Sequence, residues 1–221
     1  MINKSNIFEV YIDDKYRLYT INMVLGKQVY DERLITENNQ EYREWNPKKS
    51  KLAALIKKGC NNIFIRKNDT VLYLGCSSGT TVSHVSDIVG KQGFIYALDF
   101  APRMMTDMVF VAEDRPNIAP ILADSNQPQT YQDKVSEVDI VYQDISQKNQ
   151  VEIFLKNTKM YLKKGGYALL AIKARSVDIT RHPRLIFNDA RQKLEKEMII
   201  IDSRVLDPFE LDHIMFVCKN K

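Results

Sequence analysis

Two charged residues, Asp144 and Lys173, each stand just beyond a run of largely apolar residues. The runs, 138–142 and 167–172, are typical of buried strands, and the carboxyl ends of neighbouring parallel strands meet at one edge of a sheet. A carboxylate beside an amine at that edge could act on a proton of a bound substrate. The same pair could instead close the sheet edge as a simple ion pair, and position alone leaves both interpretations open.

A glycine loop expected at the same sheet edge indicates what kind of ligand the edge could hold. Residues 71–74 predict a short buried strand that ends at Gly75, and small residues up to Gly79 lead into a helical pattern opened by Thr80 and Thr81. The loop lacks the G-x-G-x-x-G spacing of dinucleotide sites, which disfavours an NAD-linked dehydrogenase. No Gly-Lys-Ser/Thr follows to bind a polyphosphate.

Two aspartates further along the chain narrow the choice of ligand. Asp99 ends the apolar run that begins at residue 94, about 20 residues after the loop, where a carboxylate can accept hydrogen bonds from both hydroxyl groups of a ribose. Asp124 follows the run 118–122, so Gly75, Asp99 and Asp124 would line one crevice of a doubly wound sheet. The common ligand with a ribose but no phosphate is S-adenosylmethionine (SAM). The sequence therefore predicts a SAM site.

The elements that must position these residues alternate along the chain. Helices are expected at 47–58, 80–89, 101–115, 149–161 and 183–196. Strands are expected at 71–74, 94–99, 118–122, 138–142, 167–172, 198–205 and 214–218. This alternation predicts an α/β fold with a doubly wound, mostly parallel seven-stranded sheet, of the Rossmann-like SAM-dependent methyltransferase type.

The N-terminal residues follow a different pattern. Apolar and polar residues alternate over 8–20 around a turn at Asp13-Asp14, and a second such stretch covers 29–35. We expect a small N-terminal antiparallel β-appendage over 1–40 and a methyltransferase domain over 41–221. The appendage could bind a partner or brace the main domain, and bracing is the simpler role.

The junction between these two parts predicts a helix start. Asn46 can cap a helix whose first residue is Pro47, and the apolar spacing continues to Lys58 before Gly59 ends it. The lysines of this segment are interpreted mainly as a solvated helix face.

Composition limits the functions that the chain could have. The net charge of +4 over 221 residues and the pI near 8.8 allow a basic substrate surface. They fall short of the value above ~9 expected of an independent nucleic-acid-binding domain. Three widely spaced cysteines predict neither a disulfide framework nor a metal site. No secretion signal and no apolar run of the ~18 residues that a membrane span needs are found, so no membrane association is expected.

Five stretches carry a resemblance to a known family. They are Y-R-E-W-N-P-K-K-S-K-L-A-A at 42–54, V-L-Y-L-G-C-S-S-G-T-T-V-S-H-V-S-D-I-V-G at 71–90, V-D-I-V-Y-Q-D-I-S-Q at 138–147, A-I-K-A-R-S at 171–176 and D-P-F-E-L-D-H at 207–213. Through them the sequence resembles fibrillarin, the SAM-dependent RNA 2′-O-methyltransferase of box C/D ribonucleoproteins, over nearly its whole length. The resemblance implies ribose methylation of rRNA, and possibly tRNA, directed by a guide RNA.

The resemblance also implies roles for individual residues. The family's catalytic constellation falls on Lys51, Asp144, Lys173 and His213. Its cofactor-binding positions fall on Gly75, Thr80, Thr81, Asp99, Phe100, Asp124, Ser125, Asp144, Ile145, Ser146 and Gln147. Departures from the family pattern are Cys76 and Ser77 in place of two alanines, Asp99 in place of glutamate and Ser146 in place of alanine. The shorter side chain of Asp99 keeps the carboxylate but reduces its reach toward a ribose.

In the expected mechanism, the ribose 2′-oxygen attacks the methyl group of SAM while its proton is removed. Lys173 is the candidate base, Lys51 is an alternative group that could stabilise negative charge on the oxygen, and His213 could orient the target ribose or phosphate. Two other interpretations stay open: a non-catalytic fibrillarin-like scaffold subunit, and a methyltransferase acting on a small molecule or a protein glutamine.

The resemblance implies partners as well. No aromatic and basic stripe typical of an RNA-recognition module is present. We therefore expect a Nop-type scaffold protein, a kink-turn-binding protein and a box C/D guide RNA to supply target choice. Candidate docking surfaces are the β-appendage and the helix around 181–196. The sequence lacks the Gly/Arg-rich tail of most eukaryotic fibrillarins, so we expect a cytoplasmic archaeal protein or a nucleolar protein of a reduced eukaryote.

Overall fold

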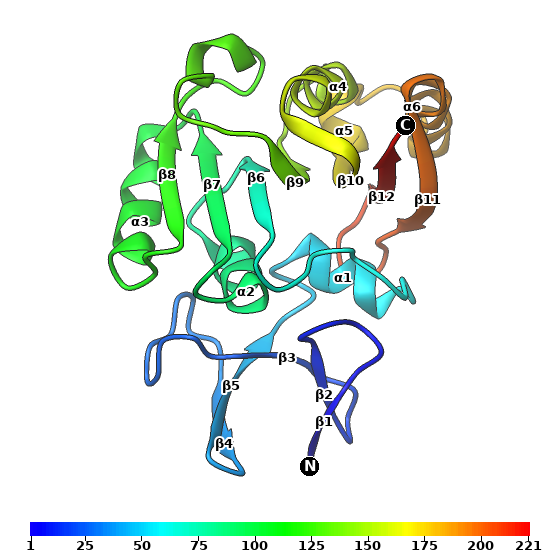
Figure 1. The fold of residues 1–221 in the computed structure, drawn as a ribbon. Coiled ribbons are helices and arrows are strands. Elements are labelled where there is room, and N and C mark those ends of the chain that lie inside the picture. The colour runs from blue at the N-terminus through cyan, green and yellow to red at the C-terminus, as the bar shows by residue number, and fades with distance from the viewer.

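The strand ends that carry the candidate site belong to one seven-stranded sheet. A computed structural model describes all of residues 1–221 (Figure 1). The strands of this sheet lie in the order β11-β12-β10-β9-β6-β7-β8. Their bounds are β6 (Thr70–Leu74), β7 (Phe94–Asp99), β8 (Ile118–Leu122), β9 (Val138–Asp144), β10 (Leu162–Lys173), β11 (Met198–Val205) and β12 (His213–Asn220). β12 pairs antiparallel with both of its neighbours, β10 and β11, and all other pairings in the sheet are parallel. This order confirms the doubly wound, mostly parallel sheet expected from the sequence.

Helices cover both faces of this sheet. Their bounds are α1 (Lys51–Lys57), α2 (Thr80–Val89), α3 (Pro102–Glu113), α4 (Gln150–Tyr161), α5 (Ala174–Val177) and α6 (Pro183–Glu197), with a short 3₁₀ helix η1 (Pro128–Tyr131). In Figure 1, α4, α5 and α6 lie above the sheet, and α1 and α2 lie below it. No helix combines the length and the apolar character needed to span a membrane.

The hydrophobic core is divided between the two faces. Val71 and Tyr73 belong to a cluster of buried residues shared with α1, α2 and α3, whereas Leu72 and Leu74 belong to a second cluster shared with α4 and α6. Successive side chains of a strand point to opposite faces, so a strand covered on both sides must be apolar throughout. This explains the unbroken apolar run before Gly75.

The helix α1 begins four residues later than the sequence pattern suggests. The expected cap, Asn46, instead closes a turn, because its side-chain oxygen accepts a hydrogen bond from the backbone N–H of Lys48 at 2.9 Å. Ser50 is the N-cap, and its hydroxyl accepts a hydrogen bond from the backbone N–H of Ala53. Lys51 therefore becomes the first residue of α1.

The N-terminal residues form a separate five-stranded antiparallel sheet in the order β1-β2-β3-β5-β4. Its strands are β1 (Ile2–Lys4), β2 (Tyr11–Asp13), β3 (Leu18–Ile21), β4 (Leu34–Glu37) and β5 (Gln40–Trp45). The hairpin of β2 and β3 was expected, but the second stretch is strand only from Leu34. Before it, the carboxylate of Glu32 accepts hydrogen bonds from the backbone N–H groups of Val29 and Tyr30 and holds a loop. Because β5 belongs to this sheet, the sheet extends beyond residue 40.

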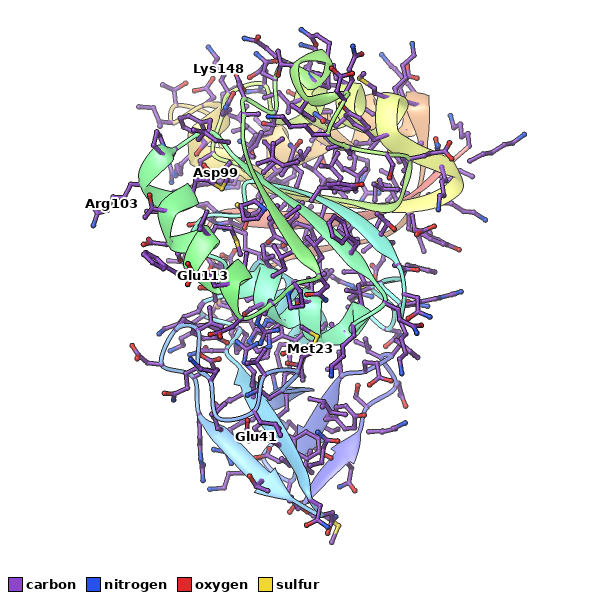
Figure 2. The ribbon with its side chains drawn as sticks, turned by 60° about the vertical axis from the view of Figure 1, so that its left-hand side comes forward. Met23, Glu41, Asp99, Arg103, Glu113 and Lys148 are labelled. Carbon is purple, nitrogen blue, oxygen red and sulfur yellow. The ribbon has the colours of Figure 1, made fainter.

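Buried polar contacts fix the N-terminal sheet to α2. Arg43 is fully buried, pairs with Asp87 at 2.8 Å and donates a hydrogen bond to the hydroxyl of Ser83. Thr20 also donates to Asp87, at 2.8 Å. Figure 2 shows Met23, whose backbone N–H donates to the same aspartate, at the junction between the two parts. The N-terminal sheet is therefore attached to the helix that follows the glycine loop.

Candidate functional site

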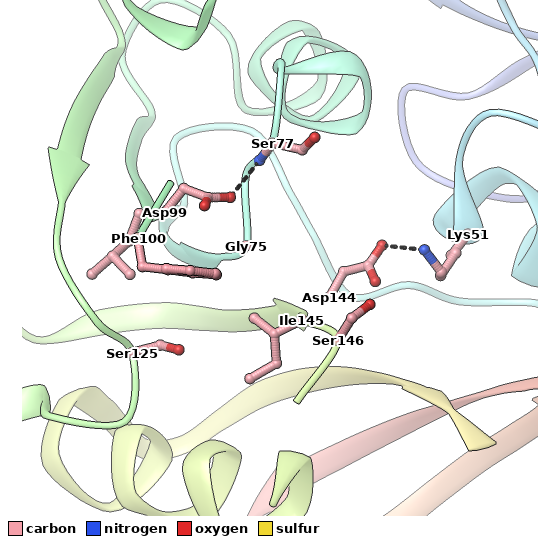
Figure 3. A pocket seen from close by; sticks show the side chains of 10 residues that line it. Lys51, Gly75, Ser77, Asp99, Phe100, Ser125, Asp144, Ile145 and Ser146 are labelled. Carbon is pink, nitrogen blue, oxygen red and sulfur yellow. Dashed lines mark hydrogen bonds and ion pairs between the residues drawn. The ribbon is translucent and has the colours of Figure 1, made fainter. Parts of the chain in front are cut away.

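The sheet register brings three loop residues together at the point where the strand order reverses. Leu74, the last residue of β6, lies opposite Leu98 on one side and Gln143 on the other. The residues that follow these positions, Gly75, Asp99 and Asp144, therefore lie next to one another, as the sequence predicted for the first two. They border a crevice of about 280 Å³ (Figure 3). Its lining residues are Lys51, Gly75, Ser77, Leu98, Asp99, Phe100, Ser125, Asp144, Ile145 and Ser146.

Gly75 is the position in this crevice where no other residue fits. Its φ of +82° lies in the left-handed region, which residues with a Cβ rarely adopt. A Cβ at this position would collide with the backbone carbonyl oxygen of Asp144 and lie 2.8 Å from the side chain of Ile145. The glycine thus lets the loop after β6 approach the end of β9 closely.

Asp99 is held by backbone groups on both of its oxygens. One oxygen accepts the N–H of Ser77 at 2.9 Å and the other accepts the N–H of Ala101 at 3.0 Å. A carboxylate has about four lone-pair sites, so two remain for a ligand. The side chain is only 8% exposed, and Figure 3 shows it beside Phe100 at the crevice. A fixed acceptor of this kind suits a pair of ribose hydroxyl groups.

Asp144 pairs with a lysine from a distant part of the chain. The ammonium of Lys51, at the start of α1, lies 2.9 Å from its carboxylate (Figure 3). Burial acts to lower the pKa of Lys51, but the charge of Asp144 and the hydrogen bond to it outweigh that effect and raise the pKa above its usual 10.5. Lys173, the partner expected from the sequence, is exposed and forms no ion pair. The structure therefore pairs Asp144 with Lys51 and corrects the expected Asp144–Lys173 pair.

The four residues of the expected constellation nevertheless lie on one side of the sheet. Tyr142, Ala171 and Met215 belong to the core cluster shared with α1. Because strand side chains alternate, Asp144, Lys173 and His213 project to that same side. Lys173 and His213 are also directly opposite each other on β10 and β12.

His213 is a neutral imidazole at this edge. Burial lowers its pKa below the usual 6.5, and the charge of Lys51 acts in the same direction, although the hydrogen bond to Leu211 opposes them. Its Nδ1 lies 2.7 Å from the carbonyl oxygen of Leu211, which can only accept, so Nδ1 carries the proton. The other nitrogen, Nε2, is then free to accept a hydrogen bond.

Other residues expected from the sequence lie near the crevice without lining it. Asp124 caps a local turn, because its carboxylate accepts the N–H of Asn126 at 2.9 Å. Its neighbour Ser125 lines the crevice instead. Thr81 is buried and donates a hydrogen bond to the hydroxyl of Ser50 at 3.0 Å. Thr80 and Gln147 also lie outside the lining set.

Two lining residues, Ser77 and Leu98, were not expected from the sequence. Ser77 has a φ of +50° and presents its N–H to Asp99. The only signal for it was its place in a loop of small residues between two glycines. Leu98 borders the crevice because it directly precedes Asp99, the last residue of β7, and this position already lay within the expected strand.

The chemistry of the lining fits SAM. Asp99 offers acceptors for the ribose, and Leu98, Phe100 and Ile145 offer apolar surface for a purine ring. The one cationic side chain of the lining, Lys51, is engaged by Asp144, so nothing here would neutralise a polyphosphate. No group of three or more His, Cys, Asp or Glu side chains is placed to hold a metal ion.

Comparison with known proteins places this chain in a family. A family profile described as Fibrillarin matches residues 2–221. The chain is 49% identical over 215 residues to the fibrillarin-like rRNA/tRNA 2′-O-methyltransferase of Methanocaldococcus jannaschii, covering 96% of this chain and 93% of that protein.

Two solved structures agree with this result. Aeropyrum pernix fibrillarin in complex with natively bound S-adenosyl-L-methionine is similar with a TM-score of 0.91 at 42% identity, covering 99% of this chain and 97% of that one. A fibrillarin/Nop5p complex is similar with a TM-score of 0.89 at 36% identity, covering 99% of this chain and 100% of that one. From its end-to-end match in sequence and its shared fold, the chain belongs to the fibrillarin family.

Proposed function

We propose that the protein transfers the methyl group of SAM to ribose 2′-oxygens of rRNA, and of tRNA, as the catalytic subunit of a box C/D ribonucleoprotein. The observation that carries this proposal is the crevice in which Gly75 and Asp99 stand beside the Lys51–Asp144 ion pair. The names of the relatives support it, because a protein 49% identical to this chain is a fibrillarin-like rRNA/tRNA 2′-O-methyltransferase.

Gly75, Asp99 and Ser125 would hold the cofactor. Gly75 allows the closest approach of the backbone, and Asp99 is already oriented by two backbone N–H groups, so its carboxylate need not reorganise to receive a ribose. Thr80, Thr81, Phe100, Asp124, Ile145, Ser146 and Gln147 are further proposed contacts. When bound, SAM supplies an activated methyl group.

Lys51 and Lys173 are proposed to have different roles because their environments differ. Asp144 keeps Lys51 protonated, so Lys51 is suited to stabilise negative charge on the 2′-oxygen and not to accept its proton. Lys173 is exposed and forms no ion pair with a carboxylate, so its amine is free to approach a bound ribose. It is therefore the proposed proton acceptor, on the same side of the sheet as Asp144.

His213 is proposed to orient the target nucleotide. Its protonated Nδ1 is fixed by the carbonyl of Leu211, so Nε2 can accept a hydrogen bond from a ribose hydroxyl. Its neutral form is maintained by burial. Protonation would convert Nε2 from an acceptor into a donor and remove this contact.

Target choice is proposed to come from partners. The net charge of +4 is modest for a protein that must bind RNA through many phosphate contacts alone. The similar fibrillarin/Nop5p complex supports a Nop-type scaffold protein as one partner. A kink-turn-binding protein and a box C/D guide RNA would complete the particle. The relative from Methanocaldococcus jannaschii favours the cytoplasm of an archaeon over a nucleolus.

A reconstituted methylation assay tests the proposal. Labelled SAM and a matched target RNA are supplied to the chain alone, and to the chain assembled with the scaffold, the kink-turn-binding protein and the guide. We expect methylation only in the assembly, at a nucleotide that moves when the guide sequence is changed. Site-specific methylation by the chain alone would contradict the role of the guide, and a SAM-binding assembly that never methylates would contradict the catalytic role.

A further inference from the structure

Two buried glutamines join the carboxyl ends of β9 and β10 behind the crevice. Gln143, the residue before Asp144, is fully buried, and Gln150, the first residue of α4, is 1% exposed. The side-chain amide of Gln143 donates to the carbonyl oxygen of Gln150 at 2.7 Å. Neither glutamine lines the crevice, so their amides have no part in binding the cofactor as described above.

The side chain of Gln150 makes a two-point contact with the backbone of Lys173. Its oxygen Oε1 accepts the N–H of Lys173 at 3.1 Å, and its nitrogen Nε2 donates to the carbonyl oxygen of Lys173 at 3.3 Å. The N–H and C=O of one strand residue point to the same side of the strand, so a single carboxamide can satisfy both.

This contact replaces a strand that is missing at this point. The last residue of β9, Asp144, pairs with Ala171, so β9 has left the sheet before it reaches Lys173 two residues later. On the far side, β12 continues, and the N–H of Ala174 donates to the carbonyl oxygen of Asp212 at 2.9 Å. Gln150 therefore supplies on the β9 side the pairing that β12 supplies on the other.

The backbone contact matters because the Lys173 side chain has no other anchor. It is exposed and forms no ion pair or side-chain hydrogen bond. The direction in which the amine leaves the sheet edge is consequently set by the backbone of β10 at that residue.

We propose that Gln150 is a positioning residue that fixes Lys173 toward the target 2′-oxygen. This inference rests on the proposed function, in which Lys173 accepts the proton of that oxygen. Gln150→Met keeps the length of the side chain but removes both hydrogen bonds. It should leave the SAM dissociation constant nearly unchanged and slow single-turnover methyl transfer by roughly 10- to 100-fold, since small misplacements of a reacting group are costly.

Asn220 offers a matched control on the same strand. Its side-chain amide donates to the carbonyl oxygens of Leu162 and Lys163, both at 3.1 Å, at the opposite end of β10. Asn220→Leu thus also removes two hydrogen bonds to the β10 backbone, but far from Lys173. We expect a lowered Tm with an unchanged transfer rate. Equal slowing by Gln150→Met and Asn220→Leu at equal loss of Tm would overturn the proposal.

A double variant separates positioning of Lys173 from other effects. If Gln150 acts through Lys173, Gln150→Met combined with Lys173→Ala should be no slower than Lys173→Ala alone. A double variant slowed by the product of the two single effects would contradict the inference. If Lys173→Ala is slow and Gln150→Met is not, only this inference fails. If Lys173→Ala itself keeps the wild-type rate, the proposed role of Lys173 fails, and the inference with it.

Gln150→Glu provides a second test that still applies if Gln150→Met fails to fold. A protonated carboxyl group has the shape of the carboxamide, with a donor and an acceptor in the same places, whereas the ionised form has lost its donor. The transfer rate of this variant, divided by the wild-type rate at each pH, should therefore decrease as the pH is raised. A ratio that does not change with pH would contradict a role for the two-point contact.

Discussion

Lys51 and Asp144 form an ion pair at 2.9 Å although 93 positions separate them in the sequence. Lys51 stands at the start of α1, directly after the segment that leaves the N-terminal sheet, and Asp144 stands at the end of β9. Thr81 of α2 donates to Ser50, the cap that precedes Lys51, and Arg43 fixes the N-terminal sheet to the same helix. The N-terminal sheet and α2 together therefore place a lysine at the crevice.

Replacement of Lys173 tests its proposed catalytic role. Lys173→Ala removes an exposed amine that is not part of the crevice lining, so SAM affinity should change little. Loss of a general base typically costs ~10²-fold or more in turnover. Single-turnover methylation in the assembled particle, with a parallel SAM titration, measures both quantities. Loss of binding in proportion to turnover would mean that Lys173 is structural.

The close approach at Gly75 predicts a specific failure. Gly75→Ala forces a Cβ against the carbonyl of Asp144, which should weaken SAM binding. This overpacking should also lower the free energy of unfolding by about 1–3 kcal/mol, in addition to the cost of the strained backbone. Gly165→Ala is the control, because Gly165 has a φ of +74° but a Cβ added there would meet no atom within 4 Å. Gly165→Ala should lower the free energy of unfolding only by the ~1–2 kcal/mol that a residue with a Cβ loses in the left-handed conformation, and SAM binding should stay intact. Similar losses of SAM affinity in the two variants would contradict the role given to Gly75.

Asp99 is expected to contribute directly to cofactor affinity. Asp99→Ala removes the ribose acceptor and frees the N–H groups of Ser77 and Ala101, so SAM should bind about 1–3 kcal/mol more weakly. Isothermal titration calorimetry of SAM into the purified chain measures this change. Unchanged affinity would remove Asp99 from the cofactor site.

His84 makes folding stability depend on pH. It is fully buried against Trp45, its Nδ1 lies 2.8 Å from the hydroxyl of Thr20, and burial lowers its pKa well below 6.5, with Arg43 and Arg115 acting in the same direction. In the unfolded chain, His84 binds a proton as the pH falls through about 6.5, whereas in the folded chain it does not. Stability is therefore fully present above pH 6.5 and falls as the pH is lowered, by up to about 1.4 kcal/mol per pH unit for this group.

Thermal unfolding of the wild type and of His84→Gln between about pH 7.5 and 5.5 isolates this effect. The variant should start from a lower Tm, because its stacking and hydrogen bonds are changed, but its Tm should fall less steeply toward acid. Parallel curves for the two proteins would show that His84 does not control the acid response.

Much of the fold could be predicted because its signals are local. The strand expected at 198–205 has the same bounds as β11, and the glycine corner at Gly75 lies where its apolar run and small residues indicated. The capping of α1 was harder, since Asn46, Pro47 and Ser50 are all acceptable at a helix start. Only the turn that Asn46 closes with Lys48 decides for Ser50.

The site was predicted less completely, because its contacts depend on register between distant elements. Asp144 and Lys173 both follow apolar strands, but the sequence does not reveal that Asp144 pairs with Ala171 and that β9 ends there. That offset separates the two side chains, and α1 brings Lys51 to Asp144 instead. The two-point contact of Gln150 with Lys173 arises because β9 ends two residues before Lys173, and no local sequence pattern predicts it.

The position of the transferred methyl group decides whether this chain is a guided ribose methyltransferase. After reaction of the assembled particle with SAM, the target RNA is digested to nucleosides, and the methylated product is identified by mass spectrometry. We expect one ribose-methylated nucleoside, located at the guided nucleotide by its resistance to alkaline cleavage and missing in Asp144→Ala. A methyl group found on a base, on a protein glutamine or on a small molecule would refute the proposed function.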